Sequence, residues 1–479
     1  MRDISHPHSS LVNRRALLGI IALIGLVWLG IIQFGIPWPL ALVLAAQLAL
    51  FVLLFKRPVW AMASLMVGQL TSSQYVIYLT PELEISVRFL WTILAVLLLV
   101  PILQNRGGVE LGNGARRILV PAIIFFALAT ISNAVNTDMT NTLKYSRSAV
   151  TAMAILVLLP AVVENRRDIK LLSLVVLITG SISAIVAVMQ HYSYIGMPSF
   201  SITTSGYGGT RTEGLTESAL HLAFYLPVIL IPMVSIYFLK GVGPGARKIL
   251  AVLTIVMIAA LYFTFTRSGM YALAPGLLAI IFWMQDKPRK ELLLASLVLI
   301  AAFVYYSDMT SNRYSQWFTD DSSAAARPVL WQAGISIAMD NPLLGIGYYS
   351  FQEESLEYSS NIRSQYMETQ GAGGILGQTE VHNDFIRAWL SYGTLALLAY
   401  VSIFVGILRN FLDVYRKSTN RFLKGLALGC CGALVAYVVN AFTHNVMDSV
   451  WLLWIMGGFS IAVVKLLVVP KPDEQANRS

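Results

Sequence analysis

Histidine is the residue in this chain whose type and setting most clearly suggest acid–base chemistry. His382 stands directly before Asn383 and Asp384 in the segment VHNDF. A neutral imidazole can accept a proton from a hydroxyl group, so His382 is a candidate general base. Asn383 and Asp384 could cap the helix that follows or orient the ring. The alternative is an ordinary histidine at the membrane–water boundary, where a helix begins.

A second histidine is found in a similar setting near the end of the chain. The segment THNVMD contains His444, Asn445 and Asp448. It could join the same pocket as His382, or it could simply form the turn between the last two apolar runs. The sequence favours the turn.

Two arginines are candidate ligands for phosphate, because the planar guanidinium grips phosphate oxygens with two hydrogen bonds. Arg267 lies in FTFTRSGMYAL, at a tight turn between two apolar runs. Ser268 and Gly269, which follow it, are expected to leave room for a ligand close to the backbone. The alternative for Arg267 is a plain surface charge.

Arg327 opens the segment RPVLWQAGISIAMDNPLLGIGYYSF. Pro328 is typical of a first helical turn, so we predict an amphipathic helix that begins here, runs through Ala338 and ends at Asp340. Its apolar side chains would pack on the membrane domain; they are Leu330, Trp331 and Ile335. The alternative is a structural interfacial helix whose arginine is only a surface charge.

Other chemistry finds little support in the residue pattern. The chain has no HExxH, CxxC or DxD spacing, so no metal site is predicted. GIGYYSF lacks the strand and helix that flank a dinucleotide loop. The acidic pairs at 320–321 and 353–354 could serve a glycosidase, but we interpret them as solvated loop charges. The two adjacent cysteines, Cys430 and Cys431, are interpreted as small packing residues.

The elements that position these residues are membrane helices. Of the 479 residues, 56% are hydrophobic and only 12% are charged, whereas soluble domains are about 25% charged. Apolar runs of the length that crosses a bilayer recur along the chain. We therefore predict an all-α, polytopic membrane protein with about 12–14 spans, at 16–34, 38–55, 59–78, 85–103, 118–134, 145–163, 170–190, 218–239, 249–266, 270–284, 291–306, 383–408, 425–444 and 449–468. The run 16–34 is expected to be a retained first helix and not a cleaved signal.

This pattern predicts three parts: transmembrane helices 1–11 in residues 1–304, one large external loop in 305–382, and C-terminal helices with a cytoplasmic tail in 383–479. With the N-terminus inside, the cytoplasmic segments hold 25 of the 34 Lys and Arg residues, as expected of a membrane protein. The net charge of +9 is therefore explained by topology, and no nucleic-acid partner is needed.

The nine remaining basic residues, 34 less 25, fall on the outer side, where topology does not require them. Each alone could contact lipid headgroups or pair with an acidic residue. As a set they favour an anionic ligand; they are Arg88, Lys144, Arg147, Arg211, Arg267, Arg313, Arg327, Arg363 and Arg387. The outer connection 191–217 is polar, Gly-rich and aromatic, which suits a sugar or a plain flexible connector.

Three stretches in order resemble the O-antigen ligase and polymerase family of bacterial membrane glycosyltransferases. They are the turn Thr266-Arg267-Ser268-Gly269, the block from Arg327 to Phe351, and His382-Asn383 followed by Gly393-Thr394. A weaker fourth stretch surrounds Arg211. The resemblance covers roughly residues 205–410. Ala396 departs from it, since many ligases have a second glycine there.

The resemblance implies a metal-independent and cofactor-free transfer of a glycan from an undecaprenyl-pyrophosphate-linked donor to an acceptor hydroxyl. It places this transfer at the outer face of the bacterial plasma (inner) membrane, facing the periplasm. His382 would deprotonate or orient the acceptor, and Arg267 and Arg327 would hold the pyrophosphate. Substrate binding would involve further residues, namely Arg211, Asn383, Arg387, Arg147 and Arg88.

Two reactions remain open within the family. The acceptor is either lipid A-core, which defines a ligase, or a growing glycan, which defines a repeat-unit polymerase; the His-Asn and Gly-Thr motif favours ligation. Outside the family, the alternative is a transporter for the same lipid-linked sugars. Transporters place charges near the bilayer midplane and are built from repeats, and neither feature is present in this sequence.

Overall fold

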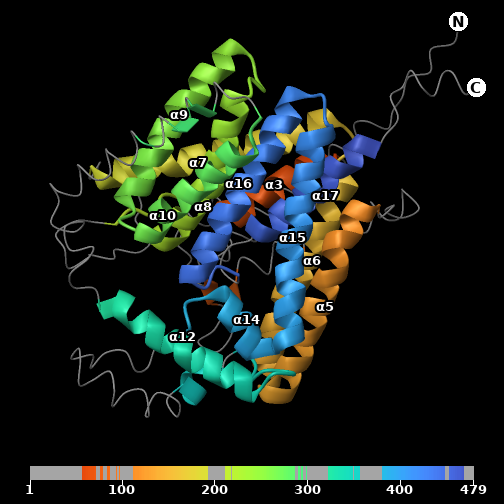
Figure 1. Cartoon of the computed structure of the whole chain (residues 1–479), viewed down its shortest axis with the longest axis vertical. Helices are drawn as coiled ribbons and strands as arrows, with labels where there is room; N and C mark the ends of the chain where they lie inside the picture. The colour runs from red at the N-terminus through yellow and green to blue at the C-terminus, as the bar shows by residue number, and fades with distance from the viewer. Residues whose placement is uncertain are drawn as a thin grey trace, which may run out of the picture. The chain divides into compact units, whose positions relative to one another are not determined.

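The computed structural model describes residues 57–71, 76–78, 84–86, 112–192, 211–216, 218–285, 322–348, 350–355, 380–447 and 452–468, with a few isolated residues near 93 and 290. Within these residues the chain is helical apart from one short hairpin (Figure 1), which confirms the predicted class. Seven described helices are long and apolar enough to cross a membrane, so this is a polytopic membrane protein. The predicted spans 16–34 and 38–55 lie outside the described residues, as do most of 85–103 and 291–306.

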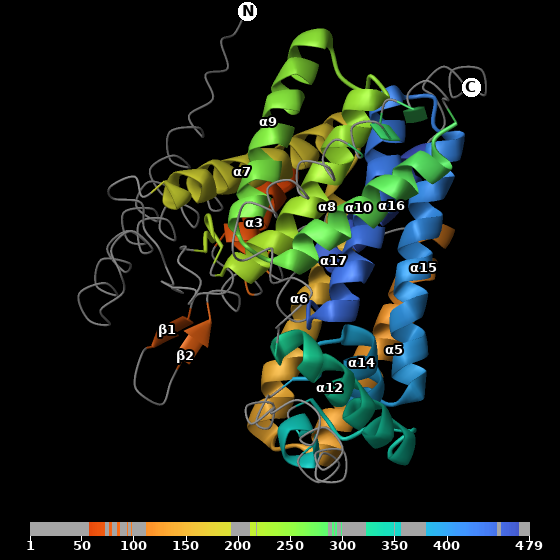
Figure 2. The same ribbon diagram turned by 60° about the vertical axis from the view of Figure 1, so that its left-hand side comes forward.

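The chain divides into two compact units. The first comprises Met1–Val109 and Ala161–Thr179. In it, helix α3 (Pro58–Thr71) is followed by strand β1 (Val76–Tyr78), which pairs antiparallel with β2 (Glu84–Ser86; Figure 2). The predicted span 59–78 is therefore wrong in its last part, because the helix ends at Thr71. The polar sequence Ser72-Ser73-Gln74 follows there, and β-branched residues after it favour a strand.

The second unit, Glu110–Pro160 with Gly180–Ser479, contains the candidate site residues that the structure describes. Eight predicted spans are confirmed to within a turn or two. They correspond to α5 (Asn113–Asn136), α6 (Met139–Val162), α7 (Arg166–His191), α8 (Ala219–Phe238), α9 (Pro244–Phe263), α10 (Arg267–Trp283), α16 (Arg421–Thr443) and α17 (Leu452–Val468). Helices α6 and α7 each pass from one unit into the other.

Helix α16 is the centre of the second unit and packs against α8 and α10. Small residues let membrane helices approach closely, because no side chain separates the backbones. Gly432 of α16 faces Gly276 of α10, and a Cβ at Gly432 would lie only 2.5 Å from the Gly276 carbonyl oxygen. Gly429 of α16 lies directly against Pro232 of α8. This packing fixes the relative positions of α8, α10 and α16, whose ends border the candidate site.

The predicted single span 383–408 is wrong, because a glycine divides it into two helices. Helix α14 (Asp384–Tyr392) ends at Gly393, and α15 (Thr394–Lys417) begins at the next residue. Gly393 has φ +87° and ψ 173°, a conformation that side chains other than hydrogen strongly disfavour. The carbonyl carbon of Leu343 would lie 2.5 Å from a Cβ at this position. Gly393 is therefore required for both its backbone angle and its lack of a side chain.

The turn that follows Asp340 docks on this helix junction. The backbone N–H of Thr394 donates to the Pro342 carbonyl (2.8 Å), and the N–H groups of Ile346 and Gly347 donate to the carbonyls of Leu390 (2.9 Å) and Ser391 (3.0 Å). The NPLLGIG turn and the Gly393-Thr394 pair, separated in the sequence, are therefore direct neighbours in the fold.

The same turn is also tied to the last turn of α5. Asn136 Nδ2 donates to the Gly345 carbonyl at 3.1 Å, and Asn133 Oδ1 accepts from the Tyr348 N–H at 2.9 Å. The turn is thus held from two sides.

Helix α12 (Ser322–Asp340) carries Arg327 and packs on α14 (Figure 1). The predicted end at Asp340 is confirmed. The predicted start at Arg327 is wrong, because the helix begins at Ser322 and Pro328 lies inside it. The sequence SSAAAR before Pro328 explains this extension, since alanine and arginine favour helix. Apolar residues from α12, α14 and the turn form one cluster, with the side chains of Leu330, Ile337, Ala338, Ile346, Phe351, Val381 and Leu390.

Candidate functional site

Arg211 is held at the turn between α9 and α10. Its Nε donates to the Thr264 carbonyl at 3.2 Å, and its Nη2 donates to Thr266 Oγ1 at 2.7 Å. Thr266 is the residue at the N-cap position of α10, and Arg267 is the first residue of that helix. The structure therefore brings the predicted ligands Arg211 and Arg267 to the same turn.

This turn combines two sources of positive charge. Arg267 is half-buried at the beginning of α10, where the unsatisfied N–H groups and the helix dipole favour an anion. The expected space beside Gly269 is absent, because α8 occupies it: a Cβ at Gly269 would lie 2.6 Å from the Ala223 carbonyl oxygen. The glycine serves close helix packing, and a ligand would approach the Arg267 side of the turn.

His382 occupies an unusual backbone position at the entrance to α14. Its φ is +53°, in the left-handed region that is uncommon for residues other than glycine, although histidine is among those that adopt it more often. Strained backbone of this kind is concentrated at functional sites. Asn383 follows as the N-cap, and its Oδ1 accepts hydrogen bonds from the N–H groups of Phe385 (3.0 Å) and Ile386 (3.1 Å). The cap therefore fixes the backbone of the residues that directly follow His382.

Three hydrogen bonds join residues 380–384 to residues 442–446. Asn383 Nδ2 donates to the Phe442 carbonyl at 3.2 Å. Asn445 Nδ2 donates to Glu380 Oε2 at 2.6 Å, and Asp384 Oδ1 accepts from the Val446 N–H at 2.9 Å. We call these two stretches, with their three bonds, the histidine clamp, because each contains one histidine.

The histidine clamp places the two imidazoles next to each other. The rings of His382 and His444 lie edge to face, with centroids 6.1 Å apart and an interplanar angle of 84°. His444 is also the C-cap of α16, and its ring lies 5.1 Å from that of Phe224 in α8. Residues 443–447 therefore form the turn after α16, and they bring His444 beside His382; a joint role of the two histidines in a site stays a prediction.

The electrostatic surroundings favour neutral imidazoles. Burial lowers the pKa of His382, and the charges of Arg327 and Arg387 lower it further, while Glu380 raises it. Burial, together with the charges of Arg327, His382 and Arg211, lowers the pKa of His444 to about 3. The charges of Arg327, His382 and Arg211 thus add to burial, and the lowered pKa of His444 favours its neutral form.

The side chain of Arg387 is buried next to Glu380 of the histidine clamp. Its guanidinium stacks on the Tyr348 ring, 4.0 Å from the centroid, and its Nη1 lies 3.7 Å from Glu380 Oε1. Glu380 therefore connects Arg387 to Asn445 of the clamp. These contacts make Arg387 a support for the site, and binding of substrate by this residue stays a prediction.

For three other residues that the sequence suggested, the structure gives no contact with this group or does not describe the residue. Arg147 is half-buried on α6, two residues beyond Tyr145, whose ring lies 6.0 Å from that of Tyr348. Arg88 and Asp448 fall outside the described residues. Their predicted roles stay predictions.

Glu380 and Tyr348 contact this group but were not predicted from the sequence, whereas the segment with Asn445 was predicted either to join the pocket of His382 or to form a turn. A signal was present for the clamp. A histidine followed by an asparagine occurs twice, at 382–383 and at 444–445, in stretches that both border apolar runs. No comparable signal marks Tyr348, because its role depends on the docking of the turn 341–348.

The described residues contain no group of three or more His, Cys, Asp or Glu side chains that could hold a metal ion. The positive charge of the site comes from arginines on separate elements, and the neutral base comes from the histidine clamp. Together these groups could bind an anionic leaving group on one side and deprotonate a hydroxyl on the other.

Comparison with known proteins bears on the same part of the chain. Residues 252–401 match a family model described as O-antigen ligase, and this range contains Arg267, Arg327 and His382. A curated relative, the exopolysaccharide production protein ExoQ of Rhizobium meliloti (strain 1021), is 29% identical over 131 residues, which are 26% of this chain. The alignment covers 27% of that relative's length. Through residues 252–401, this polytopic membrane protein is therefore similar to the O-antigen ligase family.

Proposed function

We propose that the protein transfers a glycan from an undecaprenyl-pyrophosphate donor to the hydroxyl of an acceptor sugar, at the outer face of the bacterial inner membrane. The observation that carries this proposal is the contact of His382 with His444, together with the turn that holds Arg211 beside Arg267. A site with several arginines and a neutral histidine suits a pyrophosphate leaving group and a hydroxyl nucleophile.

In the proposed reaction, the acceptor oxygen attacks the anomeric carbon of the donor sugar. The bond from this carbon to the pyrophosphate oxygen breaks, and the pyrophosphate takes the electron pair. Arg267, Arg211 and Arg327 stabilise the developing negative charge. His382 takes the hydroxyl proton and later releases it to water, so that atoms and charges balance.

His444 assists in the proposal as a positioning residue. Its ring packs against His382 on one side and Phe224 on the other. Because burial keeps it neutral, His444 does not add a positive charge that would oppose protonation of His382. The hydrogen bonds of the clamp keep both rings in place while the proton moves.

The acceptor has two candidates. The description of the matching family model supports lipid A-core, the acceptor of a ligase. The relative ExoQ is named for exopolysaccharide production, which supports a growing glycan, the acceptor of a polymerase. The histidine motif favours ligation, which we take as the first candidate.

The test uses the full chain in proteoliposomes with a purified lipid-linked repeat unit, with and without lipid A-core. Transfer to core identifies a ligase, and chain growth without core identifies a polymerase. The variant His382→Gln should reduce the rate by about 10²–10⁴, the usual contribution of a general base, while binding of the donor is retained. Arg267→Lys and Arg327→Lys should each lose most activity, because lysine lacks the two-pronged guanidinium.

His444→Gln is the matched control, since it removes the neighbouring imidazole and leaves His382 in place. We expect a smaller loss than for His382→Gln. Small and equal losses at both positions would remove His382 from the mechanism. Absence of transfer to either acceptor by the unaltered protein would reject the proposed function as a whole.

A further inference from the structure

A cavity of about 750 Å³ lies between α5 and α15, lined by residues distinct from those of the candidate site. Such a volume is typical of sites for small ligands. Its walls are formed mainly by apolar side chains, including Val120, Ile124, Leu128, Leu395 and Leu398. Most of these side chains are exposed in the protein, so the cavity is an open groove on a surface that faces lipid.

Three arginines lie at one end of this groove, namely Arg116, Arg117 and Arg409. They come from the beginning of α5 and the last turns of α15. The charge asymmetry of the chain predicts that this end faces the cytoplasm, opposite to the end that bears the histidine clamp. The groove is therefore apolar along its length and cationic at one end.

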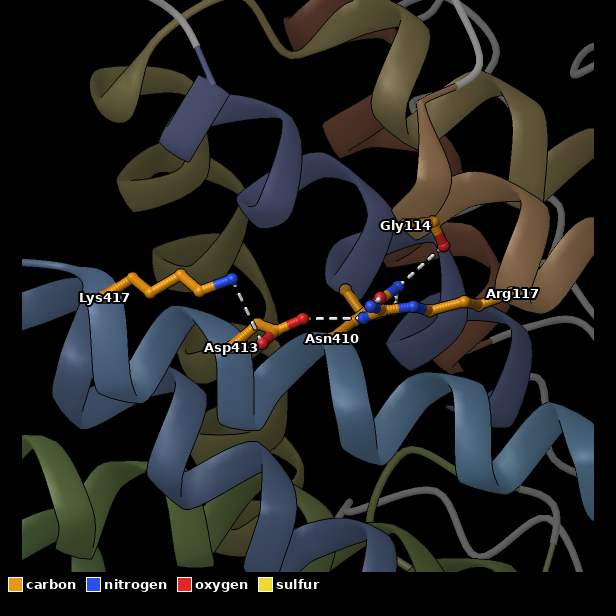
Figure 3. A network of polar contacts seen from close by, with 6 residues as sticks. Gly114, Arg117, Asn410, Asp413 and Lys417 are labelled. Atoms are coloured by element: carbon orange, nitrogen blue, oxygen red, sulfur yellow. Dashed lines mark hydrogen bonds and ion pairs between the residues drawn. The ribbon is translucent and has the colours of Figure 1, made fainter.

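One of the three arginines is already neutralised. Arg117 Nη1 donates to Asp413 Oδ2 at 2.6 Å, and Lys417 Nζ lies 3.4 Å from Asp413 Oδ1 (Figure 3). Asp413 is thus shared between Arg117 and Lys417. Arg116 and Arg409 are exposed, and within the described chain neither has a carboxylate partner. Two cationic side chains therefore remain available at the end of the groove.

The floor of the groove is fixed by close packing of the two helices. Asn410 Nδ2 donates to the Gly114 carbonyl at 2.9 Å (Figure 3). A Cβ at Gly406 would lie 2.5 Å from the Arg117 carbonyl oxygen, so α15 touches the α5 backbone there. The helices are held together beside the arginines, and a ligand would find a preformed groove.

We propose that this groove binds one anionic glycerophospholipid, with its phosphate between Arg116 and Arg409 and an acyl chain along the apolar wall. Basic pockets between membrane helices on the cytoplasmic side are known to bind anionic headgroups. From Arg116 to Leu128 and from Leu395 to Arg409 the helices rise about 18 and 21 Å at 1.5 Å per residue. Half of the hydrocarbon core is about 15 Å, so the groove accommodates one leaflet's chain and the headgroup region.

The experiment measures lipid retained by the full-length protein, taken from nanodiscs that contain equal amounts of phosphatidylglycerol and phosphatidylethanolamine with the same acyl chains. Native mass spectrometry counts the lipids that stay bound. We expect about one retained phosphatidylglycerol per chain. The double variant Arg116→Gln/Arg409→Gln should lower the preference for phosphatidylglycerol over phosphatidylethanolamine about 25-fold. This follows because the loss of each arginine should weaken binding of the anionic lipid about fivefold.

Two further variants separate the groove from general charge. Ser402→Phe leaves all charges in place but fills the apolar wall, and it should also lose the lipid. The matched control Lys248→Gln/Arg421→Gln removes two exposed basic residues at the beginnings of α9 and α16, and it should retain the lipid. The melting temperature of each variant confirms that it is folded.

Several results would overturn the proposal: equal retention of the two phospholipids, loss of lipid in the control, or no loss in either groove variant. A third arm adds undecaprenyl phosphate at the same concentration. If it displaces phosphatidylglycerol from the wild-type protein, the groove belongs to the polyprenyl carrier and not to a glycerophospholipid. No arm requires glycan transfer, so this test stands independently of the proposed function.

Discussion

The substitution Gly393→Ala is predicted to destabilise the junction of α14 and α15, which supports the candidate site, without changing a residue that takes part in the proposed reaction. The new Cβ would lie 2.5 Å from the Leu343 carbonyl carbon, whereas ordinary contacts begin near 3.4 Å. The junction must therefore open by roughly 1 Å, the difference between these two values. Opening threatens the hydrogen bonds of Thr394 to Pro342 and of Ile346 to Leu390.

The cost has two parts. The backbone conformation at Gly393 costs a residue with a side chain about 1–3 kcal/mol, and each weakened buried hydrogen bond costs about 1 kcal/mol. We therefore expect a loss of about 3–5 kcal/mol in the free energy of unfolding, or a drop of about 3–5 °C in melting temperature. Glycan transfer should fall in parallel, because the turn 341–348 and α14 lose their common anchor.

The assay is thermal unfolding in nanodiscs together with transfer rate at a temperature well below the transition. Gly245→Ala is the control, since Gly245 lies in the first turn of α9 and has no atom within 4 Å of an added Cβ. It should lower neither quantity. Wild-type melting temperature and activity in Gly393→Ala would show that the junction does not depend on this glycine, and the structural role assigned to the motif would be wrong.

The remaining predictions concern the histidine clamp. The transfer rate should fall as pH drops through a pKa below 6.5, because His382 must be deprotonated and burial lowers its pKa. Because Glu380 raises the pKa of His382, Glu380→Gln should move this fall in rate to still lower pH. A pH–rate profile that does not move would contradict the effect assigned to Glu380. His444 binds a proton more weakly in the folded chain than in the unfolded chain, since burial lowers its pKa to about 3. Stability should therefore decrease by about 2 kcal/mol between pH 6.5 and pH 5, and His444→Gln should remove this part of the pH dependence of the melting temperature. Asn383→Ala should lower stability by about 0.5–2 kcal/mol through loss of the helix cap, and a neutral result would show that the cap is dispensable.

The membrane helices could be predicted from the sequence because hydrophobic length is a local property. The helices α5 to α10, α16 and α17 were found from apolar runs alone. The break at Gly393 could not be found this way, since the apolar pattern continues through it from Trp389 to Val401. Its cause is a contact with Leu343, fifty residues away in the sequence, and no local pattern reports such a contact.

In the candidate site, too, local features could be predicted from the sequence and long-range contacts could not. Arg267 and His382 were recognised as chemical groups because their types and neighbours are visible in the sequence. Their grouping could be expected only from resemblance, and the part of His444 could not be decided. Its place beside His382 results from the docking of the stretch 442–446 on 380–384, which involves a side-chain bond from Asn383 and another to Glu380.

The histidine clamp also sets the moment in biosynthesis at which the site can form. His444 lies 62 residues after His382, and ribosomes add about 5–20 residues per second. The stretch that fixes the His382 segment is therefore made several seconds after it, and it reaches its place only when α16 has entered the bilayer. A nascent chain that has exported His382 but not yet inserted α16 would hold an incomplete site. Under the proposed function, newly made protein would stay inactive until its insertion is nearly finished, and chains that stall before α16 would not consume the lipid-linked donor.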